Sequence, residues 1–232
     1  MRRVVTQEIL DSPDCPPIEV EKSLRDLSRI NRWFGGVATT RKLIERVAAA
    51  TGKKHFSLLE VAAGHGEVPK MAARQLARQG ITLELTMLDR MHSHMLSGNR
   101  LSGDHSVVAD ALALPFPDNS FDLVSSSLFV HHLEPTGVTL FANEALRVSR
   151  VAVLINDLIR HPLHLALVYA GWPLMRSHVS RVDGVASVRR AYVPDEVVAM
   201  MSKVKPAAKV AVSRHYLFRM GVVVWKSIPG RR

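Results

Sequence analysis

Apolar positions recur every three to four residues in two early segments, and this spacing predicts two amphipathic helices. The first is expected over residues 18–34, where a pair of glycines follows and ends it, and the second over residues 37–50. Residues 12–17 hold three prolines, which fix φ and remove backbone donors, so we expect irregular structure there. The chain is therefore expected to open with an irregular segment followed by two helices.

Short apolar runs then alternate with helical patterns, which indicates a parallel sheet with helices on both faces. A last pair of tightly joined strands is expected to be antiparallel and to lie at a sheet edge. The alternation breaks at residues 157–193, a stretch too long for a simple connection. We expect one or two inserted helices there, above the carboxyl ends of the strands, where open α/β sheets bind ligands. Strands are expected from residue 56 and over 81–89, 105–109, 121–127, 150–156, 209–216 and 217–226, and helices over 69–78, 91–99, 136–148 and from residue 194.

The 232-residue chain is 47% hydrophobic, which supplies enough apolar material for the core of one large domain. Its one cysteine, Cys15, excludes a disulfide framework and favours a reducing compartment, so we expect a cytoplasmic protein. The first residues carry two arginines but no sustained apolar segment, so we expect no secretory signal. No apolar run reaches ~18 residues, so we expect no membrane span.

The formal net charge of +10 suggests a nucleic-acid or anionic-membrane partner. The basic residues, however, are scattered along the chain, and no aromatic residues alternate with them as in a base-stacking surface. We therefore expect a small-molecule substrate and no stable nucleic-acid complex. The apolar and basic residues of the 157–193 segment fit at most a weak contact with a membrane surface.

A turn with two glycines follows the first expected strand and leads into a helix. Gly64 and Gly66 let a ligand approach the backbone and permit positive φ, and the N–H groups at the helix start face the same place. Glu60 adds an acid beside this turn. Asp89 ends the second strand about 20 residues later, where a carboxylate can accept both hydroxyls of a ribose. An ordinary tight turn at the glycines and a helix cap at Asp89 are the structural alternatives.

Three segments carry a family resemblance that covers residues 40–156. Glu60-Val-Ala-Ala-Gly-His-Gly-Glu67 is similar to a glycine-rich first motif, and Asp89 matches a ribose-binding acid. Asp110-Ala-Leu-Ala-Leu-Pro-Phe-Pro-Asp-Asn-Ser-Phe-Asp-Leu-Val124 is similar to an adenine-side motif and is the most specific of the three. Together they resemble the class I S-adenosylmethionine-dependent methyltransferases, among them the ubiquinone and menaquinone C-methyltransferases and many small-molecule O-methyltransferases. Ala62 stands where the family has its first glycine, which is a mild departure.

The resemblance implies a Rossmann-like α/β fold with a seven-stranded, mostly parallel sheet and an antiparallel C-terminal hairpin. It divides the chain into an N-terminal helical cap, residues 1–36, and a methyltransferase domain, residues 37–232, with a substrate-side helical insertion at 157–193. The implied cofactor is S-adenosyl-L-methionine. By the resemblance, Glu60, Gly64 and Gly66 line its methionine end, Asp89 its ribose, and Asp110 with Ala111 its adenine, while Ala62, Arg90 and Ser127 complete the expected cofactor contacts.

Two adjacent histidines follow the fourth strand, and we expect them near the transferring methyl group. A phenol, with an ordinary pKa of about 10, would gain from a general base near neutral pH. We therefore assign His131 and His132 as catalytic and rank His132 slightly first; hydrogen bonding to the cofactor or the backbone is their alternative role. Further substrate contacts are expected from Asn156, Asp157, Tyr169 and Trp33, with core packing as the alternative for Trp33.

The leading hypothesis is methyl transfer to a small hydrophobic aromatic or polyketide-like phenol or quinol, at oxygen or carbon. Two alternatives stay open: an RNA-directed methyltransferase, suggested by the positive charge, and a binding protein that kept the fold without catalysis. His161 and His164, three apart on one helical face, resemble half of a metal site but have no evident acidic partner, so no metal is expected. The chain is expected to be a monomer or homodimer.

Overall fold

The strands form one seven-stranded sheet in the computed structural model, which describes residues 1–12, 14–91, 105–205 and 207–227. Their order is β3-β2-β1-β4-β5-β7-β6, with β7 antiparallel to both of its neighbours and the other pairs parallel. The expected mostly parallel sheet with an antiparallel C-terminal pair is therefore confirmed. The strands are β1 His55–Val61, β2 Thr82–Asp89, β3 His105–Val108, β4 Phe121–Ser127, β5 Ser149–Leu158, β6 Ala207–His215 and β7 Arg219–Lys226.

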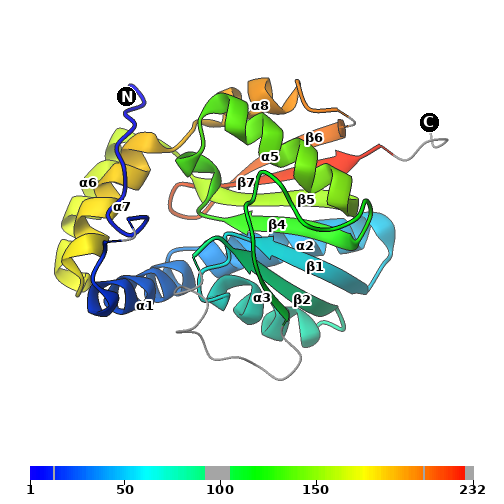
Figure 1. Ribbon diagram of the computed structural model, residues 1–232, viewed down its shortest axis with the longest axis horizontal. Helices are drawn as coiled ribbons and strands as arrows, with labels where there is room; N and C mark the ends of the chain where they lie inside the picture. Colours follow the sequence, from blue (N-terminus) through cyan, green and yellow to red (C-terminus); the bar gives the residue numbers. More distant parts are fainter. Residues whose placement is uncertain (13, 92–104, 206, 228–232) are drawn as a thin grey trace.

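Helices cover both faces of the sheet (Figure 1). The helix α3 begins at Glu67 rather than at Pro69, because Gly66 already adopts the left-handed N-cap conformation and proline is tolerated in a first turn. The helix expected over residues 91–99 lies outside the described residues beyond Met91. Among the helices that are described, none is both long and apolar enough to cross a bilayer. The helices are α1 Pro17–Trp33, α2 Gly36–Thr51, α3, which ends at Ala77, α5 Pro135–Val148, α6 Pro162–Ala170, α7 His178–Arg190 and α8 Pro194–Met201, with 3₁₀ turns η1 Val130–His132 and η2 Trp172–Leu174.

Two apolar layers flank the sheet, because successive side chains of a strand point to opposite faces. In β1, Leu59 and Val61 belong to the layer that includes residues of α5 and α8. Phe56 and Leu58 belong to the layer that includes residues of α2 and α3. Both faces of the sheet are therefore filled by packing, which leaves the ends of the strands open for a ligand site.

The carboxyl ends of β1, β2, β4 and β5 meet at one edge of the sheet. Since β7 runs the opposite way, its first residue, Arg219, pairs with Leu158 at the end of β5 and reaches the same edge. The segment expected to hold inserted helices contains α6 and α7, which lie beyond that edge (Figure 1). Four strand ends, the start of β7 and the insertion thus surround one space.

The N-terminal segment, residues 1–11, runs along α7 at this same end of the molecule (Figure 1). The carboxylate of Asp183 in α7 accepts the backbone N–H groups of Ile9 and Leu10, each at 2.9 Å. The guanidinium of Arg3 lies over the ring of Tyr192, 4.4 Å from its centroid. The segment has no regular structure, as its composition indicated, yet side-chain contacts fix its place.

Candidate functional site

A cavity of about 670 Å³ lies at the carboxyl edge of the sheet. Its walls come from the turn between β1 and α3, the ends of β2 and β4, the insertion and the N-terminal segment. Cavities of this size commonly hold small-molecule ligands. The expected cofactor residues that line it are Glu60, Ala62, Gly64, Asp89, Arg90, Asp110, Ala111 and Ser127.

The turn after β1 has an unusual backbone that brings it close to the cavity. Gly64 has φ 53° and Gly66 has φ 68°, both in the left-handed region. At Gly66, an added Cβ would lie 3.0 Å from the end of the Met87 side chain, so a larger residue would require that side chain to shift as well as a strained φ. Ala62 also has a positive φ, 55°, which costs an L-residue about 1 kcal/mol. The alanine thus keeps the glycine-type turn at a price in backbone strain.

Two further carboxylates, those of Asp89 and Asp110, line the cavity next to this turn. Asp89 is buried at the end of β2 and accepts the N–H groups of Gly64 and Met91 at 2.8 and 2.9 Å. Asp110, after β3, is exposed and accepts the N–H of Leu112 at 2.8 Å. Both carboxylates line the cavity. Asp89 therefore bonds to its own loop, as the capping alternative expected, and also faces the ligand space.

Glu60 is a fully buried acid at the end of β1. Its carboxylate accepts a hydrogen bond from the hydroxyl of Ser125 in β4. Burial raises the pKa of Glu60 to about 7, although the serine acts in the opposite direction. A cationic group that enters the cavity beside Glu60 would favour its ionised form.

The two histidines lie on η1, directly after β4, with their ring centroids 4.2 Å apart. His131 is only 2% exposed; its Nδ1–H donates to Asp157 Oδ1 at 2.6 Å, and its backbone N–H donates to Asp157 Oδ2 at 3.0 Å. Burial lowers the pKa of His131, but the carboxylates of Asp157 and Glu8 outweigh it and raise that pKa to about 9. Asp157 therefore holds a charged His131 in place.

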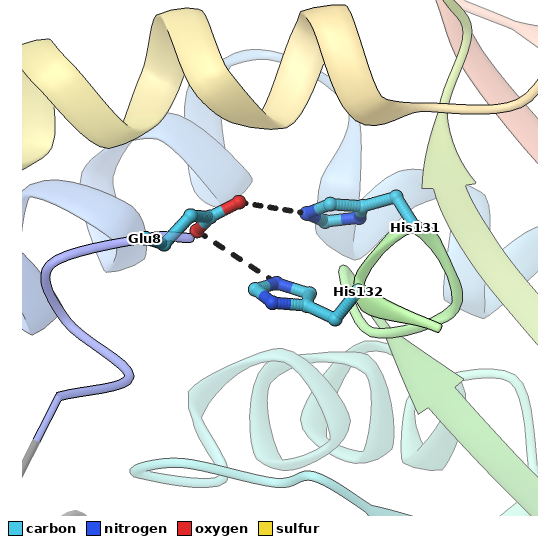
Figure 2. Close-up of side chains that lie close together, drawn as sticks. All are labelled: Glu8, His131 and His132. Carbon is cyan, nitrogen blue, oxygen red and sulfur yellow. Dashed lines mark ion pairs between the residues drawn. The ribbon is translucent and has the colours of Figure 1, made fainter. Parts of the chain in front are cut away.

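Two acids of the N-terminal segment complete this cluster. A carboxylate oxygen of Glu8 lies 3.5 Å from Nε2 of His131, and the other lies 3.7 Å from Nε2 of His132 (Figure 2). Asp11 accepts from Nδ1 of His132 at 2.8 Å. Glu8 is buried and Asp11 is partly exposed, and the imidazoles hold the pKa values of both carboxyls below the usual range. The sequence analysis missed both, because no local pattern in an irregular segment indicates a contact across 121 positions.

A buried arginine faces the same cavity. Arg219 is 2% exposed, lines the cavity and donates from Nη2 to Asn31 at 2.7 Å. Its Nη1 is buried and has no hydrogen-bond partner within the described part of the chain. Burial lowers the pKa of Arg219 to about 10, so the group is still cationic at neutral pH. The sequence analysis missed this residue too; the available signal was an arginine at the start of an otherwise apolar strand.

Asn156 and Asp157, expected to contact substrate, lie behind the cavity wall. Asn156 is buried and donates from Nδ2 to the carbonyl of Gly36 at 2.8 Å and to Oγ1 of Thr40 at 2.9 Å, which ties β5 to α2. Asp157 is directed at His131, as described above. We therefore correct both expectations: Asn156 joins two elements, and Asp157 positions a histidine.

Trp33 and Tyr169 require a similar correction. Trp33 is 59% exposed at the end of α1 and lies beside Val37 and Met71 of α2 and α3, away from the cavity, so neither the substrate contact nor core packing is found. Tyr169 is 42% exposed on α6 and packs against Trp172, with ring centroids 5.1 Å apart. In both helices, other residues occupy the inward face.

His161 and His164, the expected half of a metal site, have structural contacts. Both rings stack on Phe218, with centroids 4.9 and 5.2 Å from its ring. Nδ1 of His161 accepts the N–H of Leu163 at 3.1 Å, and Nδ1 of His164 donates to the carbonyl of Ile159 at 3.0 Å. These contacts hold α6 against the loop before β7.

Comparison with known sequences finds a match in the middle of the chain. Residues 59–152 match the family model described as a methyltransferase domain. A demethylmenaquinone methyltransferase of Renibacterium salmoninarum is 30% identical over 137 residues, which cover 59% of this chain and 51% of that protein. The chain therefore matches about half of the length of this relative.

Solved structures share the fold over nearly the whole chain. A SAM-dependent methyltransferase from Aquifex aeolicus is 17% identical, with a TM-score of 0.61, and the alignment covers 91% of this chain and 99% of that one. The plantazolicin methyltransferase BamL, solved with a triazolic desmethylPZN analog and SAH, is 12% identical, with a TM-score of 0.72 and coverages of 94% and 93%. At such identities the likeness shows the fold.

Proposed function

We propose that the chain is a class I S-adenosylmethionine-dependent methyltransferase that methylates a small hydrophobic phenol or quinol, at oxygen or carbon. The match of residues 59–152 to a methyltransferase domain and the shared fold support this assignment. One observation carries the proposal: a single cavity is lined by the glycine turn and its carboxylates and also by the two histidines and Arg219. The cofactor supplies an already activated methyl group. The protein is then required mainly to position the acceptor and to manage its proton.

The lining residues fit S-adenosyl-L-methionine, the cofactor of this family. The Asp89 carboxylate has only acceptor oxygens, which suits the two hydroxyls of a ribose. Asp110 and the small Ala111 suit the amino group and the flat ring of adenine. Glu60 and Gly64 line the end of the cavity assigned to the amino-acid part. Three acids along one cavity thus match a ligand that carries cationic and hydroxyl groups.

The affinity for this cofactor is expected to rise with pH up to about 7 and to level off above it. Below that pH, Glu60 is mostly protonated and neutral because burial raises its pKa to about 7. A cationic ligand must then displace a proton, so the slope approaches about tenfold per pH unit. Calorimetry from about pH 5.5 to 8.5 measures it. The Glu60→Gln variant should bind more weakly with a flat profile, and equal slopes in both proteins would contradict the assignment.

Apolar side chains from α1 and the insertion contribute to the lining of the cavity. Leu24 and Leu27 of α1 line the cavity, as do Val168 and Met175 of the insertion. Arg219 offers an unfilled donor in the same cavity. A flat apolar body that carries oxygen substituents, such as a phenol or quinol, matches both features. The name of the Renibacterium relative, a demethylmenaquinone methyltransferase, supports a quinol-type acceptor.

The two histidines are the proposed catalytic groups. A phenol or quinol becomes a stronger nucleophile as its proton is withdrawn. His131 already holds a proton at neutral pH because Asp157 and Glu8 raise its pKa to about 9. His132 is therefore the better candidate for receiving the proton, while the charge of His131 favours an acceptor oxyanion nearby. Asp157 acts through His131 as a positioning residue.

Replacing Arg219 by methionine is expected to lower kcat/KM for the acceptor by about 10- to 100-fold, since a charge-assisted hydrogen bond contributes about 1.5–3 kcal/mol. The affinity for cofactor should not change. The free energy of unfolding should stay equal or rise, because an incompletely paired buried charge is removed. Steady-state kinetics and thermal unfolding measure both. Arg214→Met, at an exposed arginine of β6, is the matched control; a loss of stability together with unchanged kinetics would mean that Arg219 is structural.

The acceptor class is tested with methyl-labelled cofactor and a panel of phenols, quinols, peptides and RNA. Label in a phenol or quinol is the expected result. Label in RNA with no labelled small molecule would instead support the charge-based alternative, which should weaken steeply with salt. Cofactor binding without transfer to any acceptor would favour a non-catalytic role.

A further inference from the structure

We propose that Glu8, His131 and His132 bind a divalent transition metal ion, with Zn²⁺ as the reference case. One ligand atom from each residue lies within 4.8 Å of the other two, and all three side chains line the cavity (Figure 2). The three residues come from two segments that only the fold brings together. The cluster is distinct from His161 and His164, the pair that the sequence offered as half of a metal site.

The distances within the cluster suit a shared ion better than direct hydrogen bonds. Glu8 oxygens lie 3.5 Å from Nε2 of His131 and 3.7 Å from Nε2 of His132. Hydrogen bonds from nitrogen to oxygen have lengths of about 2.7–3.2 Å. Two ligands of a tetrahedral zinc ion, each about 2.0–2.1 Å from the metal, are separated by about 3.3 Å. The observed nitrogen–oxygen distances of 3.5 and 3.7 Å are closer to the separation of two zinc ligands than to the length of a hydrogen bond.

Both imidazoles are oriented as metal ligands usually are. Nδ1 of His131 is bound to Asp157 at 2.6 Å, and Nδ1 of His132 is bound to Asp11 at 2.8 Å. In each ring Nδ1 donates its proton in the hydrogen bond to the carboxylate, and Nε2 points toward Glu8. A metal-bound histidine typically donates its other N–H to a carboxylate or carbonyl, which fixes the ring and increases its basicity.

A second observation is that Nε2 of His131 makes no hydrogen bond with any described residue, although it lies 3.5 Å from a carboxylate oxygen of Glu8. This side chain is 2% exposed, and within the described residues its buried Nε2 has no hydrogen-bond partner. A buried polar atom without a partner is rare in native proteins and indicates a missing water, ion or ligand. Here Nε2 of His131 points toward the carboxylate of Glu8, and the proposed ion would lie between the two groups.

The ligand set determines the class of ion. Two imidazoles and one carboxylate are typical of zinc and of other divalent transition metals, whereas Mg²⁺ and Ca²⁺ prefer oxygen ligands. Three protein ligands leave a coordination position for water or for an oxygen of the acceptor. Binding of an acceptor oxygen at the open position rests on the proposed function. In that case the histidines act as metal ligands rather than as proton acceptors. Metal binding itself does not depend on methyl transfer.

The test uses the full chain without a histidine tag, stripped with a chelator and titrated with Zn²⁺ and Co²⁺. We expect one equivalent to bind, to raise the unfolding temperature and, for Co²⁺, to give visible absorption bands. Glu8→Gln and His132→Ala should weaken binding at least 100-fold, and Asp11→Asn about 10- to 100-fold through the orientation of His132. His178→Ala, at an exposed histidine of α7, is the matched control and should bind as the unmodified chain does.

Other outcomes separate this proposal from the proposed function. Stoichiometric binding that survives in Glu8→Gln and His132→Ala would place the ion elsewhere and overturn the proposal. No binding by a chain that circular dichroism shows to be folded, with methyl transfer intact, would overturn the metal site and leave the proposed function standing. Metal binding by a chain that transfers label to no acceptor would support the metal site and overturn the proposed function. Asp11→Asn keeps the ligands, so it gives an answer even if a ligand variant fails to fold.

Discussion

Replacing Asp89 by alanine is expected to lower the affinity for S-adenosyl-L-methionine by about 100-fold or more while the chain stays folded. Hydrogen bonds to a charged group contribute about 1.5–3 kcal/mol each, and a ribose offers two hydroxyls to this carboxylate. The variant also loses the bonds from Gly64 and Met91, at 2.8 and 2.9 Å, so the glycine turn becomes less ordered. The lost ribose hydrogen bonds and the less ordered turn both lower the affinity for the cofactor, and calorimetric titration measures their combined effect.

The control for this variant is Glu84→Ala, which removes an exposed carboxylate from the same strand. It should bind cofactor as the unmodified chain does. Asp89→Asn keeps one acceptor oxygen and should lie between the two. Cofactor affinity that is unchanged in a folded Asp89→Ala protein would show that the ribose lies elsewhere, and the assignment of the cavity would fail with it.

Replacing both His131 and His132 by alanine is expected to lower the turnover number by at least about 100-fold, the usual contribution of a general acid or base. The affinity for cofactor should not change, because the double variant leaves the glycine turn, Asp89 and Asp110 intact. Rapid-quench assays with labelled cofactor measure the transfer step, and calorimetry measures the binding. Retained turnover in the double variant would remove the histidines from the reaction.

The double variant carries a risk to folding, since it leaves the buried carboxylates of Glu8 and Asp157 without their imidazole partners. Uncompensated buried charges cost about 3–5 kcal/mol. The single variant His132→Ala keeps the pair of His131 with Asp157 and should retain the fold. If it alone reproduces most of the loss of turnover, His132 acts on the acceptor, whereas full activity would assign the effect to His131.

Local patterns were sufficient to predict the architecture. The alternation of strands and helices, the insertion at 157–193 and the antiparallel final pair were all expected, and the sheet is confirmed. Residues 59–152 match a methyltransferase domain, as the resemblance implied. The expected cofactor agrees with the SAH bound in a solved structure that shares this fold, the plantazolicin methyltransferase BamL. The reason is physical: apolar periodicity specifies which face of each element is buried, and glycines and prolines specify where elements end.

The cofactor side of the cavity was predictable for a related reason. Parallel strands bring their carboxyl ends to one edge, so Glu60, Asp89 and Asp110 are placed together once the strand order is known. Positions in the chain therefore translate directly into positions in space. Their predicted contacts with the cofactor stay predictions until binding is measured.

The acceptor side was decided by tertiary structure alone. Glu8 and Asp11 reach the histidines from an irregular segment across about half of the chain, and Arg219 reaches the same cavity because β7 runs antiparallel beside β5. Trp33, which composition made attractive, is exposed because other residues of α1 occupy its inward face. The sequence by itself determined the fold and the cofactor edge, because these follow from local periodicity; long-range packing of a segment without periodicity determined which charges surround the acceptor.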